Sequence, residues 1–167
     1  MLNYTITRVA DAQKWDAIPA IQMNNRYLNT HNDVHASAQI CYNDEALFIH
    51  LQAQVSEIRA VETGSLGNPC EDSCLEFFFQ PVNGDDRYIN LEFNMNGCFY
   101  LGMGTGLYDL MRLVFNGDPV EVFKPKIQET ADGWEIFYQI PFSFIRRMFP
   151  QFTVAAGMQM RANCFAC

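Results

Sequence analysis

The sequence has few basic residues and no long apolar run, and each lack excludes a class of function. Its 167 residues include 11 Lys and Arg against 19 Asp and Glu, which gives a formal net charge of -8. Nucleic-acid backbones and anionic membrane surfaces attract basic proteins, so neither is an expected partner. No apolar stretch approaches the roughly 18 residues of a membrane-spanning helix. We therefore expect a globular protein that binds neither nucleic acid nor membrane.

The N-terminal residues also lack the apolar segment of a secretory signal peptide. This predicts a cytoplasmic location unless a leader has been removed.

Six cysteines lie at positions 41, 70, 74, 98, 164 and 167. A chain of this length folds without disulfides, so free thiols are expected. The Cys164-x2-Cys167 and Cys70-x3-Cys74 spacings leave a metal site as an alternative.

Apolar and polar residues alternate with a period of two along most of the chain, which is typical of half-buried strands. Strands are predicted at 34–42, 46–55, 74–81, 88–94, 98–101, 120–129, 134–140 and 152–165. A long loop is expected at 56–72 and a single short helix at 141–148. The Asn96-Gly97 pair predicts a hairpin whose two central residues both have positive φ. These elements predict one all-β domain over 1–167, an antiparallel β-sandwich of immunoglobulin-like or jelly-roll-like type.

Three predicted strands each carry polar side chains on one face, because neighbouring side chains point to opposite sides of a strand. If the strands share a sheet, one common surface holds Glu76, Asn90, Glu92, Asn94, Gln159, Arg161 and Asn163. Carboxylates, amides and Arg form paired hydrogen bonds with vicinal hydroxyls. A solvated sheet face is the simpler interpretation. A binding surface for a polar ligand is the more specific one.

Five motifs follow one another in an order that resembles a known family. They are Trp15–Pro19, Glu71–Phe79, Tyr88–Gly97, Gly133–Pro141 and Arg161–Asn163. The chain resembles the family 9 carbohydrate-binding-module-like domains, relatives of the DOMON-type β-sandwiches, over nearly its whole length. Relatives of this subgroup continue past position 167, which favours a domain truncated at its C-terminus.

The resemblance implies non-catalytic binding of the end of a plant or bacterial glycan chain between two aromatic rings, often with structural calcium. By motif position it implies hydrogen-bonding roles for Glu76 and Asn94, and it places Glu92 where those modules have Arg. With Arg161 and Asn163 of the polar face, these residues form the predicted carbohydrate site. No other cofactor is expected.

Two alternatives stay open. Glu76 and Glu92 could serve as the acid and base of a glycoside hydrolase. The chain could instead be a structural or interaction domain that has lost its sugar site, because the loop at 68–71 carries no aromatic residue.

Oxygen ligands for calcium would come from turn carboxylates, namely Asp44, Glu71, Asp72, Asp85 and Asp86. The histidines His31, His35 and His50 lack metal-ligand spacing, and Trp15 and Trp134 are expected to pack rather than bind sugar.

Overall fold

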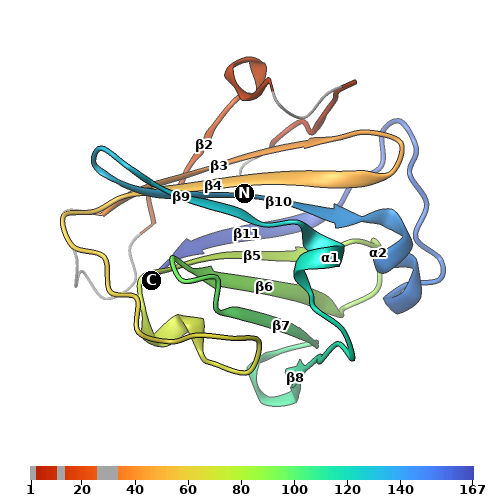
Figure 1. Cartoon of the computed structure of the whole chain (residues 1–167). Helices are drawn as coiled ribbons and strands as arrows, with labels where there is room; N and C mark the ends of the chain where they lie inside the picture. Colours follow the sequence, from red (N-terminus) through yellow and green to blue (C-terminus); the bar gives the residue numbers. More distant parts are fainter. Residues whose placement is uncertain (1–2, 11–13, 26–33) are drawn as a thin grey trace.

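The computed structural model describes residues 3–10, 14–25 and 34–167, which form two β-sheets packed face to face (Figure 1). One sheet has the order β1-β3-β4-β10-β9, with β2 also paired to β3, and the other has the order β11-β5-β6-β7-β8. Neighbouring strands are antiparallel except β1 and β3, which run parallel. The prediction of an antiparallel β-sandwich is confirmed. His31 lies outside the described residues.

The strands are β1 (Thr7–Arg8), β2 (Ile21–Gln22), β3 (His35–Tyr42), β4 (Ala46–Gln54), β5 (Cys74–Gln80), β6 (Tyr88–Asn94), β7 (Phe99–Gly104), β8 (Met111–Arg112), β9 (Lys126–Thr130), β10 (Gly133–Pro141) and β11 (Arg161–Ala166). The helices are η1 (Trp15–Ala17), η2 (Pro69–Glu71), η3 (Leu107–Asp109), α1 (Val120–Phe123) and α2 (Phe142–Met148). No described helix has the length and apolar character needed to cross a membrane.

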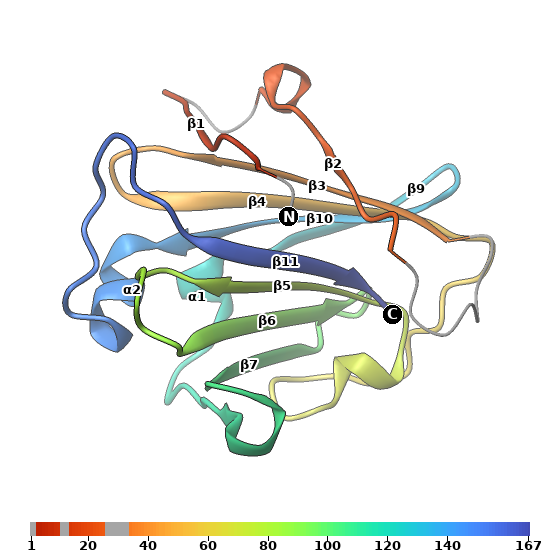
Figure 2. The same cartoon turned by 180° about the vertical axis from the view of Figure 1, so that it is seen from behind.

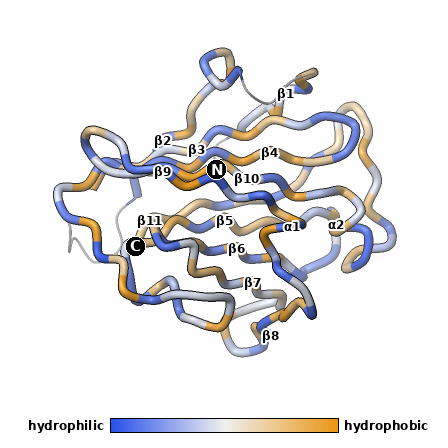
Figure 3. Tube along the Cα trace, viewed as in Figure 1, coloured by the Kyte–Doolittle hydropathy of each residue, from blue (hydrophilic) through white to orange (hydrophobic). Residues whose placement is uncertain are grey.

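The core lies between the sheets because every long strand turns its apolar side inward. Hydropathy accordingly alternates along the strands in Figure 3. Ile49 and Leu51 of β4 are buried opposite Phe77 of β5 and Leu91 of β6, within one cluster. Trp134 of β10 is 1% exposed and belongs to the same cluster, as predicted for a packing residue.

Three local predictions were wrong. Residues 120–129 do not form one strand: 120–123 form α1, because Asp118 Oδ1 accepts the Val120 N–H (2.9 Å) and Phe123 inserts into the core. The last strand covers residues 161–166 instead of the predicted 152–165, after a turn at Gly157, where φ is +78°. At Asn96-Gly97 only the glycine has positive φ, at +75°, because the hairpin closes through a three-residue loop from Asn94 to Cys98.

The N-terminal segment packs η1 on the outer face of the first sheet, while its strands β1 and β2 pair with β3 at the edge of that sheet. The Trp15 ring packs against His50 (5.3 Å between centroids) and Phe137 (5.8 Å), and the Gln39 amide donates to the carbonyl oxygens of Trp15 and Ile18. Figure 2, seen from behind, shows β2 beside β3 and, in the other sheet, β11 at the edge beside β5. The second sheet contains β5, β6 and β11, so the predicted polar face with Glu76, Glu92 and Arg161 belongs to this sheet.

Candidate functional site

Strand register brings most of the predicted site residues onto one surface of the second sheet, which we call the outward face. Directly paired residues share a face, and Glu76 of β5 pairs with Glu92 of β6, which pairs in turn with Tyr100 of β7. The members of the outward face are Cys74, Glu76, Phe78 and Gln80 from β5, Tyr88, Asn90, Glu92 and Asn94 from β6, Tyr100 from β7, Arg112 from β8, and Arg161, Asn163 and Phe165 from β11. The predicted common surface therefore exists for the strand residues, whereas Gln159 precedes β11.

The centre of the outward face is the carboxylate pair Glu76 and Glu92, each only 7% exposed. Glu92 Oε1 accepts a hydrogen bond from Asn90 Nδ2 at 2.6 Å. The other oxygen, Glu92 Oε2, and the Asn90 Oδ1 atom are both buried without a hydrogen-bond partner in the described structure. Buried acceptors of this kind cost about 1–3 kcal/mol each unless a donor arrives. A ligand hydroxyl would be such a donor.

The environment of Glu92 disfavours its charge. Burial, and next the nearby charge of Glu76, raise the pKa of Glu92 to about 7. The charge of Arg112 acts in the opposite direction but is outweighed. No Lys or Arg among residues 3–10, 14–25 and 34–167 forms an ion pair with either carboxylate. The negative charge of the two carboxylates is therefore not balanced by an ion pair with a described basic side chain.

Aromatic rings flank the carboxylates on the same face. Phe78 contacts Tyr88 (5.8 Å between centroids) and Phe165 in an edge-to-face arrangement (5.3 Å). Phe165 is 44% exposed, and Tyr88 and Tyr100 are half-buried. Such rings present apolar faces next to hydrogen-bonding groups, which is the combination that a sugar ring needs.

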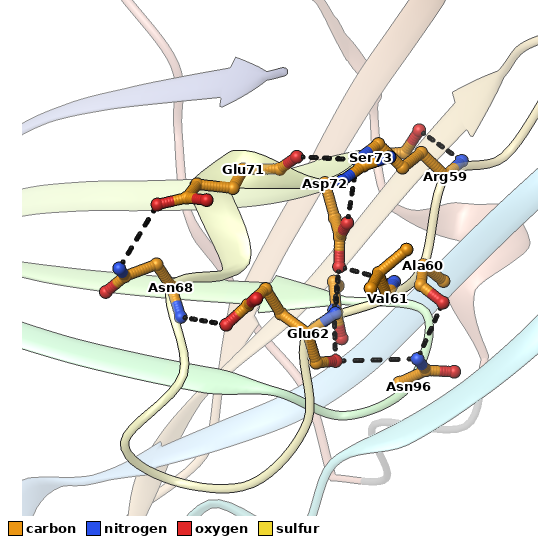
Figure 4. Close-up of polar contacts among 10 residues, drawn as sticks. Arg59, Ala60, Val61, Glu62, Asn68, Glu71, Asp72, Ser73 and Asn96 are labelled. Atoms are coloured by element: carbon orange, nitrogen blue, oxygen red, sulfur yellow. Dashed lines mark hydrogen bonds and ion pairs between the residues drawn. The ribbon is translucent and has the colours of Figure 1, made fainter.

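One end of the outward face is closed by the loop 56–72, which Asp72 anchors (Figure 4). Asp72 Oδ2 accepts the backbone N–H groups of Val61 (2.9 Å) and Glu62 (2.7 Å), and Arg59 Nε lies 3.3 Å from Oδ1. Burial would raise the pKa of Asp72, but these N–H donors together with Asn94 and Arg59 lower it below its usual value. The loop is therefore held by charge-assisted hydrogen bonds to a buried carboxylate.

Asn94, a predicted site residue, is fully buried and bonded within this network. Its Nδ2 donates to Asp72 Oδ2 (2.7 Å) and to the Glu62 carbonyl (2.9 Å), and its Oδ1 accepts the Cys98 N–H (2.9 Å). Arg161 and Asn163, in contrast, are exposed on β11. The face thus contains two deep carboxylates, one structural amide and two accessible polar groups at its edge.

Arg112 is a residue that the sequence argument missed. Its guanidinium lies over the Tyr100 ring (4.9 Å) and donates to the carbonyl oxygens of Leu66 (3.1 Å) and Phe99 (3.2 Å), and also to that of Gly67. It thereby ties β8 to the loop 56–72. The sequence did contain one indication of its importance: Arg112 is the only basic residue between Arg87 and Lys124.

The turn carboxylates named for calcium have other partners. Asp44 pairs with Arg8 (2.6 Å) and Asp85 with Arg87 (2.6 Å), while Asp72 binds the loop. In the described part of the chain, the acidic, Cys and His side chains that gather as a metal-ligand set are Cys74, Glu76 and Cys167. Two thiols do not suit calcium, which binds oxygen ligands, so the calcium expectation stays a prediction without support from this set.

Two shallow hollows lie elsewhere, around the β3–β4 turn. Their volumes are about 350 and 410 Å³, and both are lined by Asn43, Asp44 and Glu45. The linings of both hollows are mainly polar and hold no buried acceptor without a partner among the described residues. We therefore place the candidate site on the outward face, where the orphan acceptors and the aromatic rings meet.

Comparison with known proteins gives a family and a fold. The sequence profile of carbohydrate-binding family 9 matches residues 11–167. A structure from Bacteroides uniformis, whose assignment to carbohydrate binding is itself provisional, superposes with a TM-score of 0.77 at 21% identity, over 97% of this chain and 82% of that one. No curated protein matches the sequence.

Two structures of a family 9 carbohydrate-binding module from Caldicellulosiruptor kristjanssonii are also similar. The glucose complex has a TM-score of 0.60 at 12% identity and covers 96% of this chain and 75% of that one. The cellotriose complex has a TM-score of 0.57 at 14% identity and covers 98% and 72%. At these identities the likeness establishes the fold.

Proposed function

The chain belongs to carbohydrate-binding family 9, and from this premise we propose that it binds carbohydrate, without catalysis, on the outward face of the second sheet. The observation that carries this site is the opposed pair Glu76 and Glu92, with Glu92 Oε2 buried and without a partner. A protein that leaves a carboxylate oxygen unpaired in its interior sacrifices stability at that position. A donor supplied by a ligand is the simplest compensation, and a sugar supplies hydroxyl donors in pairs.

The aromatic rings support the same site. Phe165 is paired with Glu76 and Tyr100 with Glu92. One sugar unit could therefore stack on either ring with a hydroxyl directed at Glu92, while further units of an oligosaccharide would approach Asn163 and Arg161 along the edge strand β11. The exposed Phe165 ring also weighs against the alternative of a domain that has lost its site, whose main support was the lack of an aromatic residue in the loop at 68–71.

The enzyme alternative has no support. Glycoside hydrolysis needs two carboxyl groups across an open cleft, with room for the sugar and, in inverting enzymes, a water molecule. Here the two glutamates are cross-strand partners on one face of one sheet and do not stand on opposite walls of a cleft, and Glu76 Oε1 accepts hydrogen bonds from the thiols of Cys74 (3.3 Å) and Cys167 (2.8 Å). The protein is a binding domain and not an enzyme.

The end of a glycan chain is the ligand that suits this face best. The loop 56–72 lies against one end of β5–β7 in Figure 1, and its η2 packs on β5 and β6. A polysaccharide running along the strands would meet this loop at their ends, whereas a chain end fits against it. The related modules solved with glucose and cellotriose make β-linked glucose oligomers the first ligands to test.

The proposal is tested by calorimetric titration with glucose, cellobiose, cellotriose and cellotriose reduced to its alditol. We expect binding in the millimolar range or tighter, with a difference between cellotriose and its alditol if a chain end is recognised. Glu92→Gln should abolish binding, while Glu57→Gln, an exposed loop carboxylate, should leave it unchanged. Lack of binding by the folded protein to these and to other plant and bacterial oligosaccharides would refute the proposal.

A further inference from the structure

Two thiols meet at the end of the outward face where β11 runs beside β5. Cys167 lies opposite Cys74, because its N–H donates to the Cys74 carbonyl (2.9 Å) one position beyond the Ala166–Leu75 pair. Both Sγ atoms approach the same oxygen, Glu76 Oε1, at 3.3 Å for Cys74 and 2.8 Å for Cys167. One ligand atom from each of the three residues lies within 4.8 Å of the others.

We propose that Cys74, Glu76 and Cys167 bind a thiophilic divalent cation, with zinc as the best match. Zinc binds Cys at about 2.3 Å and carboxylate at about 2.0–2.2 Å in a tetrahedron, which sets sulfur and oxygen ligands about 3.6 Å apart. The present sulfur–oxygen separations are shorter by less than about 1 Å, so side-chain rotation alone would open the site. Two of the ligands are held by the strand ladder, since Cys74 and Glu76 are alternate residues of β5.

The fourth position of the tetrahedron is left to a water molecule, as in zinc sites with three protein ligands. Cys70 of η2 is not among the ligand atoms that lie within 4.8 Å of one another. The set differs from the Cys164-x2-Cys167 pair expected from sequence. Cys164 faces the core, because residues three apart on a strand point to opposite sides.

Charge at the site supports a cation independently of the thiols. Glu92, directly opposite Glu76, is 7% exposed, and its Oε2 has no hydrogen-bond partner. Within the described ranges neither glutamate pairs with a basic side chain. A divalent ion would compensate the carboxylates as no side chain does. Binding replaces the two thiol protons, which leave to solvent, and the thiolates and Glu76 become ligands.

The inference goes beyond the proposed function and is tested without sugar. The reduced chain is freed of metal with a chelator, then titrated with Co²⁺ under anaerobic conditions, and the Co²⁺ is displaced with Zn²⁺. We expect one Co²⁺ per chain, a thiolate-to-metal charge-transfer band, and visible bands of tetrahedral intensity. Zn²⁺ should displace Co²⁺, following the usual order of affinities, and should raise the melting temperature.

Substitutions identify the ligands. Cys167→Ser is the primary variant, because Cys167 is exposed and its loss leaves the core intact. It should remove most of the charge-transfer intensity and weaken Zn²⁺ binding by about 100-fold or more. Glu76→Gln should weaken binding to a similar extent but keep the thiolate band. Cys164→Ala on the same strand is the matched control and should leave both signals unchanged.

Three results would overturn the inference. The first is the lack of a charge-transfer band in the reduced, folded protein, and the second is a band unaffected by Cys167→Ser. The third is a protein lighter by two hydrogen atoms with Cys74 and Cys167 joined, since a disulfide would then be the stable form. Sugar titration of the metal-free and zinc-loaded chain separates the two hypotheses, because loss of sugar binding with an intact cobalt signal would refute only the carbohydrate site.

Discussion

Glu76 of β5 and Glu92 of β6 are direct cross-strand partners, each 7% exposed, and no basic side chain in the described structure pairs with either. Like charges directly opposite each other destabilise a sheet, and burial adds a desolvation cost. The Asn90 amide and the thiols of Cys74 and Cys167 offset these costs only in part, because Glu92 Oε2 keeps no described partner. The arrangement is what we expect of residues retained for a ligand, whether hydroxyl or cation.

Glu92→Gln should therefore stabilise the metal-free protein at high pH. The folded-state pKa of about 7 lies above the ordinary value of 4.5, so the wild type loses stability as pH rises between these values. At about pH 8 we expect the variant to gain on the order of 2–3 kcal/mol in free energy of unfolding, and near pH 4 no gain. Urea unfolding at both pH values, with chelator and reductant present, measures this. A variant that is no more stable than wild type at the higher pH would contradict the burial argument.

Asp72 should have the opposite pH signature. Its folded-state pKa is lowered from 3.8, so its stabilising contribution is fully present above 3.8 and is lost as pH falls through the lower value. Asp72→Asn should cost about 2–3 kcal/mol near neutral pH, and its deficit relative to wild type should shrink as pH falls below 3.8. Acid unfolding curves of both proteins test this, with exposed Asp86→Asn as the control. A constant deficit across this range would count against a titrating anchor.

The alternation of side chains predicted the fold and the common face of most candidate site residues, because both depend on which face of a strand a residue occupies. Glu76, Glu92, Arg161 and Asn163 share the outward face as predicted. Alternation also predicted that Phe78 and Glu76 lie on one face. It could not predict that Glu76 lies opposite Glu92, because register depends on turn length, and the Asn94–Cys98 loop was itself mispredicted.

Residues outside the alternating segments were missed for a physical reason. Arg112 lies in the two-residue strand β8, outside any alternating segment of the sequence, so its side-chain direction depends on tertiary contacts and not on a period. Val120, Val122 and Phe123 favour a strand by propensity, yet residues 120–123 form α1 because Phe123 packs in the core beside Phe99. Asn94 was assigned to the ligand through the resemblance, and its internal hydrogen bonds depend on a loop distant in sequence.

The aromatic residues of the outward face should contribute to carbohydrate affinity. Tyr100→Ala and Phe165→Ala should each weaken cellotriose binding about fivefold to tenfold, the effect of losing a stacking contact of about 1 kcal/mol. Phe48→Ala is the matched control, because Phe48 lies on the outer face of the first sheet beside one of the two hollows. If Phe48→Ala weakens binding instead, the site lies at the β3–β4 turn.

Arg112→Lys should loosen the loop while preserving charge. Lysine cannot reproduce the planar set of donors that reaches the carbonyls of Leu66, Gly67 and Phe99. We expect faster amide hydrogen exchange within residues 62–68 and unchanged exchange in the core strands β4 and β10. Uniformly faster exchange over the whole chain would show instead that Arg112 stabilises the fold globally.

Asn94 and Arg161 were predicted to share a role in the carbohydrate site, and their environments predict that they can be separated. Asn94 is 0% exposed and makes three hydrogen bonds, of which two join β6 to the loop 56–72 and one closes the hairpin at Cys98. Asn94→Ala leaves the buried Asp72 without one donor and should cost about 2–3 kcal/mol of unfolding free energy. Arg161 is exposed at the edge strand β11, so Arg161→Ala should change stability by less than about 0.5 kcal/mol.

The two substitutions should rank the other way in their effect on carbohydrate affinity, with Arg161→Ala the more damaging. Arg161→Ala removes a charged donor from the accessible edge of the face and should weaken cellotriose binding by about tenfold. Asn94→Ala, measured where the variant remains folded, should weaken it less, because Asn94 acts by positioning the loop. Calorimetry paired with urea unfolding distinguishes the two. A large loss of affinity in Asn94→Ala with unchanged stability would mean that its amide turns from the loop to the sugar on binding, and that the loop opens to admit the ligand.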